Sequence, residues 1–314
     1  MRIEILGSAA GGGFPQWNCN CRNCQSVRAG TLQGKSRSQT QVAISGDAIS
    51  SDSGSWFLLN ASPDLRMQIE RTSALHPRGE GRDSPIGGAL LTSADLDQIA
   101  GLLSLRELQP FRIYCAPSIR RVLQEDNSVF AMLNRVPRQV SWTEIVPGES
   151  FSLRTAAGDD SGICCATFSL GSRYPVYISR ERAAGLKPEE ALLGVTLTSS
   201  SGGRVAYMPA VPAIDESLIQ RLEAADLILF DGTFWSDDEL IQVQGSGATA
   251  REMGHVPVSG PEGSLRKLAG LRNPRKIFVH VNNTNPMLDE SSPECREVRA
   301  AGWEVAEDGW HFDL

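Results

Sequence analysis

The feature that most constrains this 314-residue chain is a group of three thiols near its start: Cys19, Cys21 and Cys24, in the spacing Cys-x-Cys-x-x-Cys. Three thiolates this close together make up most of a tetrahedral zinc shell. No further Cys or His lies close by in the sequence, so the fourth ligand has to come from a distant part of the chain. We therefore predict a closed zinc site, in preference to three buried cysteines without a metal.

The residues alone do not identify the fourth ligand of this zinc site. The chain has four histidines: His76, His255, His280 and His311. Asn283 and Asp289, in a polar loop after a late apolar stretch, are further candidates. A catalytic role would need an open coordination position on the metal, and we predict a structural role instead.

Charge and cysteine usage narrow the class of protein. The net charge of −7 gives no electrostatic footprint for DNA or RNA. No apolar run approaches the roughly 20 residues that a membrane span needs. The first residues, RIEILG, predict a strand and not a secretory leader. Because seven cysteines are an odd and unevenly spaced set, they predict a reduced, cytoplasmic protein and not a disulfide framework.

Apolar segments alternate between two kinds along the chain. Short strand-like runs are RIEIL (2–6), TQVAI (40–44), WFLLN (56–60), GGALLT (87–92), FRIYC (111–115), RVAYM (204–208), DLILF (226–230) and KIFVHV (276–281). Stretches with helical spacing of apolar residues are LDQIAGLLSLREL (96–108), SIRRVLQEDNSVFAML (118–133), DESLIQRLEAA (215–225) and SLRKLAGL (264–271). This alternation predicts a single layered α/β domain over residues 1–314, with sheet inside and helices outside.

Polar residues follow several of the predicted strands. Ser93, Asp95, Asp97 and Gln98 lie between the strand that ends at Thr92 and the next helix. Taken alone, Asp95 and Asp97 are better interpreted as caps that satisfy free N–H groups at the helix start.

Two histidines and a further aspartate change that balance. His255 lies in a Gly- and Pro-flanked loop, and His280 and Asp231 end strongly apolar strands, which are positions where sites are usually built. The acidic residues that follow Asp231, at positions 237–239, are interpreted as a solvated helix start.

Six motifs together resemble one known family. GSAAGGGFPQWNCNCRNC, LLNASPDLR, IAGLLSLRE, FDGTFW, REMGH and VHVNNTNP are similar to the pyrroloquinoline quinone biosynthesis protein B (PqqB) family of the metallo-β-lactamase superfamily. The resemblance runs from residue 2 to the C-terminus. It implies a metallo-β-lactamase-like αββα sandwich with the metal-site loops along one edge of the sheets.

The resemblance also implies a metal site. The superfamily motif His-x-His-x-Asp-His falls here on Ser93, Asp95, Asp97 and Gln98, so the last expected histidine is replaced by glutamine. The family is understood as a non-haem iron, O₂-dependent hydroxylase that acts on the tyrosine of a precursor-derived peptide.

Position by position, the resemblance implies that Asp97, His255 and His280 hold a catalytic Fe²⁺. Gln98 would be a weaker ligand or would orient one. Asp231 is a candidate ligand or an acceptor that orients a ligand, and Asp95 is a further member of the metal-site set. Relatives with the same cysteine loop place the fourth zinc ligand three residues after the late histidine. Here that position is Asn283, which leaves Asn283, Asp289 or water as the fourth ligand.

Three functions compete. The leading one is an iron-dependent oxygenase whose partners are O₂ and a small peptide or aromatic amino-acid substrate, without nucleic acid or membrane, and a homodimer stays open. The second is a non-catalytic carrier of the quinone cofactor or its precursor with a degenerate metal site, which Gln98 keeps in play. The third and weakest is a metal-dependent hydrolase, because Ser93 and Asp95 stand where that chemistry needs histidines.

Overall fold

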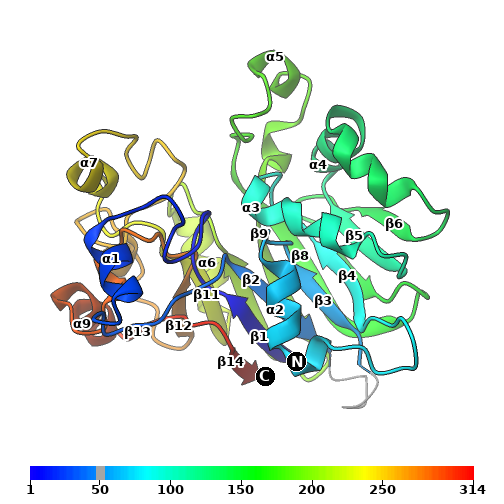
Figure 1. Cartoon of the computed structure of the whole chain (residues 1–314), viewed down its shortest axis with the longest axis horizontal. Helices are drawn as coiled ribbons and strands as arrows, with labels where there is room; N and C mark the ends of the chain where they lie inside the picture. The colour runs from blue at the N-terminus through cyan, green and yellow to red at the C-terminus, as the bar shows by residue number, and fades with distance from the viewer. Residues whose placement is uncertain (47–53) are drawn as a thin grey trace. The chain divides into compact units, whose positions relative to one another are not determined.

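The computed structural model describes residues 1–46 and 54–314 and contains two compact units (Figure 1). Unit 1 comprises Met1–Leu6, Gln41–Gly203 and His311–Leu314. Unit 2 comprises Gly7–Thr40 and Arg204–Trp310. Each unit combines sheet with helices, as the alternating apolar segments predicted, and the extent of one domain over residues 1–314 stays a prediction.

Some strands of unit 1 coincide with the predicted apolar runs, and others were not predicted. One sheet has the order β14-β1-β2-β3-β4-β5-β6, and β7, β8 and β9 are neighbours in a second. The strands are β1 (Arg2–Gly7), β2 (Gln41–Ser45), β3 (Trp56–Leu59), β4 (Ile86–Leu90), β5 (Phe111–Cys115), β6 (Val140–Glu144), β7 (Ser150–Arg154), β8 (Asp160–Gly171), β9 (Leu192–Ser199) and β14 (Trp310–Asp313). The central strands β2, β3 and β4 are buried along their whole length, which explains their continuous apolar sequences.

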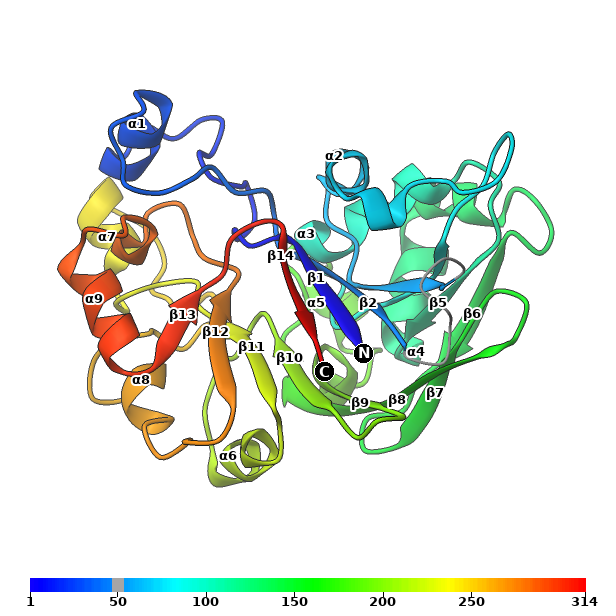
Figure 2. The same ribbon diagram turned by 90° about the horizontal axis from the view of Figure 1, so that it is seen from below.

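The helices of unit 1 are short, and several depart from α geometry. They are α2 (Leu65–Arg71), α3 (Leu96–Ile99), α4 (Pro117–Arg121) and α5 (Arg180–Ala183), the 3₁₀ segments η1 (Ser73–Leu75), η2 (Ala100–Leu105), η4 (Ser128–Asn134) and η5 (Pro188–Glu190), and the π-helical turn η3 (Val122–Asp126). Figures 1 and 2 show α2 and α3 across one face of strands β2 to β4. The long helix predicted from Leu96 is therefore one α-helical turn followed by 3₁₀ structure.

A close backbone approach accompanies that break. A Cβ on Gly101 would stand 2.1 Å from the carbonyl oxygen of Ser62, so only glycine fits there. The Gly101 N–H donates to the Ala61 carbonyl, outside the helix, at 2.9 Å. This contact presses the helix start, which carries Asp97 and Gln98, against the loop after β3.

Unit 2 carries a four-stranded parallel arrangement in the order β13-β12-β11-β10 (Figure 2). Its strands are β10 (Arg204–Met208), β11 (Leu227–Asp231), β12 (Arg275–Val279) and β13 (Trp303–Val305). Its helices are α1 (Arg22–Arg28), α6 (Glu216–Glu223), α7 (Glu239–Gln244), α8 (Ser264–Lys267), α9 (Pro293–Ala300) and the 3₁₀ turn η6 (Pro286–Leu288). An aromatic pair, Phe278 stacked on Trp303 at 4.3 Å between ring centroids, fills the core beside β12.

The register of these parallel strands sets the position of the site. Asp231, the last residue of β11, is level with Val279, the last residue of β12. Parallel strands end at the same edge of a sheet, so the loops that follow them lie together. Across residues 1–46 and 54–314, every helix is too short or too polar to cross a membrane.

Candidate metal centres

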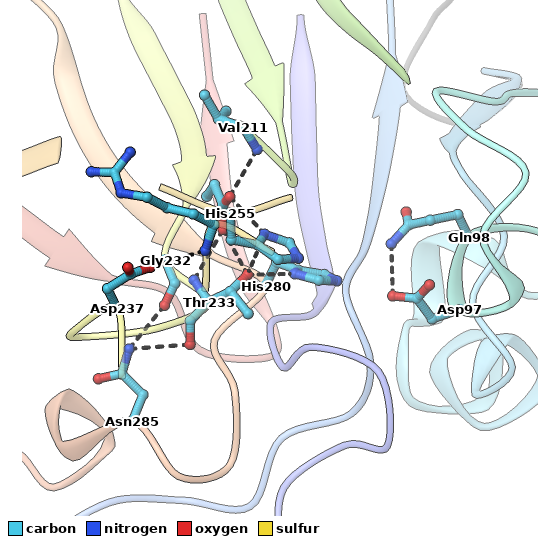
Figure 3. Close-up of polar contacts among 11 residues, drawn as sticks. Asp97, Gln98, Val211, Gly232, Thr233, Asp237, His255, His280 and Asn285 are labelled. Atoms are coloured by element: carbon cyan, nitrogen blue, oxygen red, sulfur yellow. Dashed lines mark hydrogen bonds and ion pairs between the residues drawn. The ribbon is translucent and has the colours of Figure 1, made fainter. Parts of the chain in front are cut away.

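The carboxyl ends of β11 and β12 bring three predicted residues together. The ligand atoms of Asp231, His255 and His280 all lie within 4.8 Å of one another, and all three side chains are buried. Figure 3 shows His255 and His280 side by side. Asp231 ends β11 and His280 follows β12, whereas His255 comes from the loop between them. The histidine rings are nearly parallel, 5.4 Å apart.

Asp231 acts as an acceptor for the groups around it. Oδ2 accepts from the Val211 N–H and the His255 Nδ1, each at 2.8 Å. Oδ1 accepts from the Thr233 N–H at 3.0 Å and from the Thr233 hydroxyl at 2.6 Å. A fully buried carboxylate with both oxygens engaged in this way orients its neighbours. Of the two predicted roles for Asp231, ligand or acceptor, the geometry favours the acceptor.

Thr233 connects the two histidines, although its position in the sequence gives no signal for this role. Its hydroxyl oxygen lies 2.8 Å from Nδ1 of His280 and 3.1 Å from Nδ1 of His255. A hydroxyl has one proton to donate and two lone pairs that accept. Because the proton goes to Asp231, both Nδ1 atoms must be the donors toward Thr233. The proton of each neutral ring is then on Nδ1, and the lone pair of each ring is on Nε2.

This arrangement suits a divalent metal. Imidazole Nε2 atoms are good ligands for iron and zinc, and the hydrogen bond at the opposite nitrogen fixes the tautomer that can bind. His280 also has φ of +57°, in the left-handed region that non-glycine residues seldom adopt. Such positions cluster at functional sites, where the surrounding structure holds them. Unit 2 therefore contains two histidines whose Nδ1 contacts suit metal binding through Nε2.

The turn that carries Thr233 is held by its own contacts. The Asn285 amide donates to the carbonyl oxygens of Gly232 at 3.0 Å and Thr233 at 3.3 Å (Figure 3). A Cβ on Gly232 would stand 2.7 Å from the Phe278 Cβ, so the turn needs glycine at this position. Asn285 and Gly232 thus fix Thr233 relative to β12.

In unit 1, the loop after β4 holds the other predicted ligands. The Gln98 amide donates to the Asp97 carboxylate at 3.0 Å (Figure 3), while its Oε1 is buried and has no hydrogen-bond partner among the described residues. A buried amide oxygen without a partner is costly, and a cation beside Asp97 would satisfy it. The chemistry of this pair therefore fits a metal-binding role.

Asp95 corrects the capping interpretation. It occupies the N-cap position of α3, yet its side chain makes no capping hydrogen bond. Its carboxylate instead accepts from the Ser93 hydroxyl at 2.7 Å. Capping thus does not account for the aspartate at this position.

Tyr177 holds the same loop in place. The Tyr177 hydroxyl, from the β8–β9 connection, donates to the Ala94 carbonyl at 2.6 Å. Burial, followed by the charge of Asp95, raises the pKa of Tyr177, so the hydroxyl stays protonated and remains a donor. This hydrogen bond therefore fixes the loop that carries Asp97 and Gln98. A lone tyrosine in a polar connection gives no sequence signal for this role.

The second centre is the cysteine loop of unit 2. The sulfurs of Cys19, Cys21 and Cys24 lie within 4.8 Å of one another, next to α1. The side-chain amide of Asn283 faces all three, with Nδ2 at 3.1, 3.7 and 3.4 Å from the respective sulfurs. Asp289, the alternative, accepts from the Ser291 N–H and hydroxyl instead. All seven cysteines are unpaired in the structure, as predicted.

These distances fit a four-coordinate zinc site. With Zn–S of about 2.3 Å and Zn–O of about 2.1 Å, the S···O edge of a tetrahedron is about 3.6 Å. The Asn283 amide could therefore take the fourth vertex of such a site, because rotation of the amide by a half turn presents Oδ1 there in place of Nδ2. Burial raises the pKa of Cys24 to about 11, so without a cation this thiol stays protonated at neutral pH, and zinc would displace its proton.

Glu239 joins the loops of the two centres. It was predicted to be part of a solvated helix start, and the structure shows that it is buried. It begins α7 as expected, but it is only 5% exposed and not solvated. Its carboxylate accepts from the Trp235 N–H at 2.6 Å and from the Thr284 hydroxyl. Thr284 is next to Asn283, and Trp235 is two residues after Thr233. The acidic run 237–239 looked like a helix start, and sequence alone does not distinguish a buried member of such a run.

We expect Glu239 to make stability depend on pH. Burial raises its pKa from 4.5 to about 7, so the folded chain holds this proton more tightly than the unfolded chain. The stabilising contribution is complete below about pH 4.5 and is lost as pH rises toward about 7, by up to roughly 3 kcal/mol. Urea unfolding at about pH 5 and about pH 8 should show a smaller pH difference in Glu239→Gln than in the unsubstituted protein. Equal differences in both proteins would contradict this assignment.

The chain is similar over its whole length to proteins of one family. Residues 55–281 match the beta-lactamase superfamily domain. The chain is 41% identical to the coenzyme PQQ synthesis protein B of Azotobacter vinelandii and 43% identical to that of Xanthomonas oryzae pv. oryzae, with 100% of each chain covered. The crystal structure of Zn(2+)-bound PqqB from Methylobacterium extorquens aligns with a TM-score of 0.90 at 39% identity, again over 100% of both chains. The predicted metallo-β-lactamase fold and the predicted resemblance are confirmed.

Proposed function

Because this chain belongs to the coenzyme PQQ synthesis protein B family within the beta-lactamase superfamily, we propose that it acts in the biosynthesis of pyrroloquinoline quinone as an iron-dependent oxygenase. The proposed substrate is the tyrosine, or a related aromatic group, of a small peptide. The observation that carries the proposal is the pair of histidines whose Nδ1 atoms are engaged by Thr233 and Asp231. These contacts put the lone pair of each ring on Nε2, the tautomer that can bind a metal.

His255 and His280 would hold Fe²⁺ together with Asp97, which gives the two-histidine, one-carboxylate set typical of non-haem Fe(II) oxygenases. Gln98 would add its unpartnered Oε1 as a weak, neutral ligand. When bound, Fe²⁺ supplies the redox chemistry with O₂ that protein side chains lack. The protein's own contribution is orientation. Asp231 and Thr233 hold the histidines through their Nδ1 atoms, and the Tyr177 contact holds the loop of Asp97.

A structural zinc at Cys19, Cys21, Cys24 and Asn283 is part of the same proposal. Its support is the convergence of the three sulfurs and the Asn283 amide, together with the Zn(2+)-bound state of the Methylobacterium extorquens relative. Asn283 follows His280 by three residues, so the zinc would anchor the loop that carries a histidine ligand.

Metal analysis after anaerobic reconstitution with Fe²⁺ tests the proposal. We expect one zinc and about one iron per chain in the unsubstituted protein, and loss of the iron alone in His280→Ala. Gln98→His should retain iron and bind it more tightly, because imidazole is a stronger ligand for Fe²⁺ than a neutral amide. His311→Ala, at an exposed histidine of unit 1, is the matched control and should leave both metals unchanged.

A different metal pattern would favour the second function. If the unsubstituted protein holds zinc alone and only Gln98→His holds iron, the chain has lost the oxygenase chemistry. A carrier of the quinone cofactor or its precursor then explains the fold better. Oxygen uptake with Glu–Tyr dipeptides, measured beside dipeptides that carry Phe in place of Tyr, separates turnover from binding. A metal-dependent hydrolase stays the weakest candidate, because the Ser93 hydroxyl and the Asp95 carboxylate bind each other where that chemistry needs histidines.

A further inference from the structure

A cavity of about 240 Å³ lies in unit 2, apart from the ligand residues of both metal centres. It is formed by η6, α9 and β13 together with the segment before β2, and α9 packs directly on β13 and η6. Its lining residues are Arg37, Met287, Glu290, Cys295, Arg299, Glu304, Val305, Glu307 and Trp310. The volume corresponds to roughly eight water molecules, the size of a small organic ligand.

Arg37 is an unusual wall for such a cavity. Its side chain is 5% exposed, and its backbone is fixed by paired hydrogen bonds with Phe14 at 2.7 and 2.8 Å. One guanidinium nitrogen donates to the Ala306 carbonyl, but the buried Nε–H has no partner among the described residues. Burial lowers the pKa of Arg37, opposed by the charges of Glu307 and Asp308. A buried N–H donor without an acceptor is rare, and it makes Arg37 a candidate donor for a ligand in the cavity.

The carboxylates of the cavity have partners, yet two of them retain an available oxygen. Glu290 uses Oε2 to bind Arg299 at 3.2 Å, and Glu307 uses Oε2 to bind Lys35 at 2.6 Å. An ionised carboxylate has about four acceptor positions, so Oε1 of each can still accept. Glu304 differs, because Arg275 engages both of its oxygens at 2.7 and 3.0 Å.

The charges therefore select against simple ions. A plain anion attracted to Arg37 would face Glu290 and Glu307, and a plain cation attracted to these glutamates would face Arg37. Asp308, the other carboxylate near Arg37, already accepts from the Ser38 N–H and hydroxyl and from the Ser8 hydroxyl. A ligand with one acceptor end and one donor end satisfies both walls.

The remaining walls are apolar. Met287 is 1% exposed, and Val305 and Trp310 complete this side of the cavity. Burial raises the pKa of Cys295, which keeps its thiol neutral. Together these side chains offer space for a short hydrocarbon group.

We propose that this cavity binds a small zwitterion of the α-amino acid type. The carboxylate accepts from Arg37 Nε–H, the ammonium donates to Oε1 of Glu290 and Glu307, and an apolar side chain packs on Met287, Val305 and Trp310. The site does not rest on the proposed oxygenase function. Met287 and Glu290, which line the cavity, belong to the segment 280–290 that also carries His280 and Asn283, and the Glu290 N–H donates to the Gln33 carbonyl at 2.7 Å. Occupancy of the cavity would therefore stabilise the loop that both metal centres share.

Calorimetric titration of the zinc-loaded full chain with three probes tests the site. L-leucine carries both charged groups, 4-methylpentanoate lacks the ammonium, and 3-methylbutylamine lacks the carboxylate. We expect saturable binding of L-leucine at one site, and binding of each single-charge probe weaker by about tenfold or more. No saturable heat with L-leucine up to about 20 mM would overturn the proposal, as would equal affinity for 4-methylpentanoate.

Substitutions locate the binding. Arg37→Met removes the donor at similar length and should weaken L-leucine binding by about tenfold or more, while Arg272→Met, at an exposed arginine of the same unit, should not change it. Because Arg37 also bonds the Ala306 carbonyl, Glu307→Gln provides a second variant that leaves this contact intact. It should weaken L-leucine binding severalfold and leave 4-methylpentanoate binding unchanged or stronger. If L-leucine binds both variants as tightly as it binds the unsubstituted protein, it binds elsewhere and the proposal is wrong.

Discussion

Cys24→Ser is expected to reduce the zinc content from one ion per chain to nearly none and to destabilise unit 2 by on the order of 4 kcal/mol or more. Cys24 is fully buried beside the Asn283 amide, and both close the same small shell. A serine hydroxyl is a poor zinc ligand at neutral pH, and without zinc the loop is joined to Asn283 only by weak hydrogen bonds. Zinc analysis of the purified protein and urea unfolding followed by fluorescence measure the two effects.

Cys115→Ser is the matched control for this experiment. Cys115 is also fully buried, but it lies on β5 in unit 1, away from the cysteine loop. Its substitution should cost about 1–3 kcal/mol for burying a hydroxyl and leave one zinc per chain. Equal zinc content in Cys24→Ser and Cys115→Ser would show that the loop is not a metal site.

Position 283 gives a graded test of the same centre. Asn283→Asp keeps an oxygen at the fourth vertex and adds a charge, so zinc should bind at least as tightly as in the unsubstituted protein. Asn283→Leu, of similar size, should bind zinc more weakly by about tenfold or more. Equal zinc affinity in both variants would show that water, and not residue 283, completes the shell.

The sequence predicted those parts of the fold that depend on continuous burial. The apolar runs at 111–115 and 204–208 match β5 and β10 residue for residue, because strands buried on both faces have no polar alternation to obscure them. β6 has an intermediate-to-exposed pattern and a short mixed sequence, so it gave no comparable signal. The helix from Leu96 was overestimated, because apolar spacing does not show where a neighbouring loop forces a 3₁₀ turn, as at Gly101.

Some residues of the candidate site could be predicted from the sequence, and others are revealed only by their contacts in the structure. Asp231 and His280 end apolar strands, so their place at one edge could be predicted, and the Gly- and Pro-flanked loop marked His255 as a candidate. Thr233 could not be predicted, because one hydroxyl in FDGTFW gains its importance only from the convergence of three side chains around it. The burial of Glu239 could not be predicted for a similar reason, since it depends on Thr284, 45 residues later.

Thr233→Val is expected to weaken metal binding at His255 and His280 by about 10–100-fold. Valine has nearly the shape of threonine, so the turn held by Asn285 should persist while the hydroxyl is lost. His280 Nδ1 then loses the partner at 2.8 Å that fixes its tautomer. Neutral imidazole can then place its proton on Nε2, the atom that has to bind the metal, and part of the population becomes unable to bind. Titration with Fe²⁺ under anaerobic conditions measures the affinity.

A nitrogen-15 spectrum of the histidine side chains in the metal-free protein distinguishes this positioning role from general loss of structure. The unsubstituted protein should show protons on Nδ1 of both His255 and His280, and Thr233→Val should show a mixture of tautomers at His280. His255 should change less, because Asp231 still accepts from its Nδ1 at 2.8 Å. Thr233→Ser keeps the hydroxyl and should restore both the tautomer and most of the affinity. If Thr233→Val binds Fe²⁺ as tightly as the unsubstituted protein and keeps both protons on Nδ1, then Asp231 and the backbone alone orient the histidines, and the threonine has no part in the site.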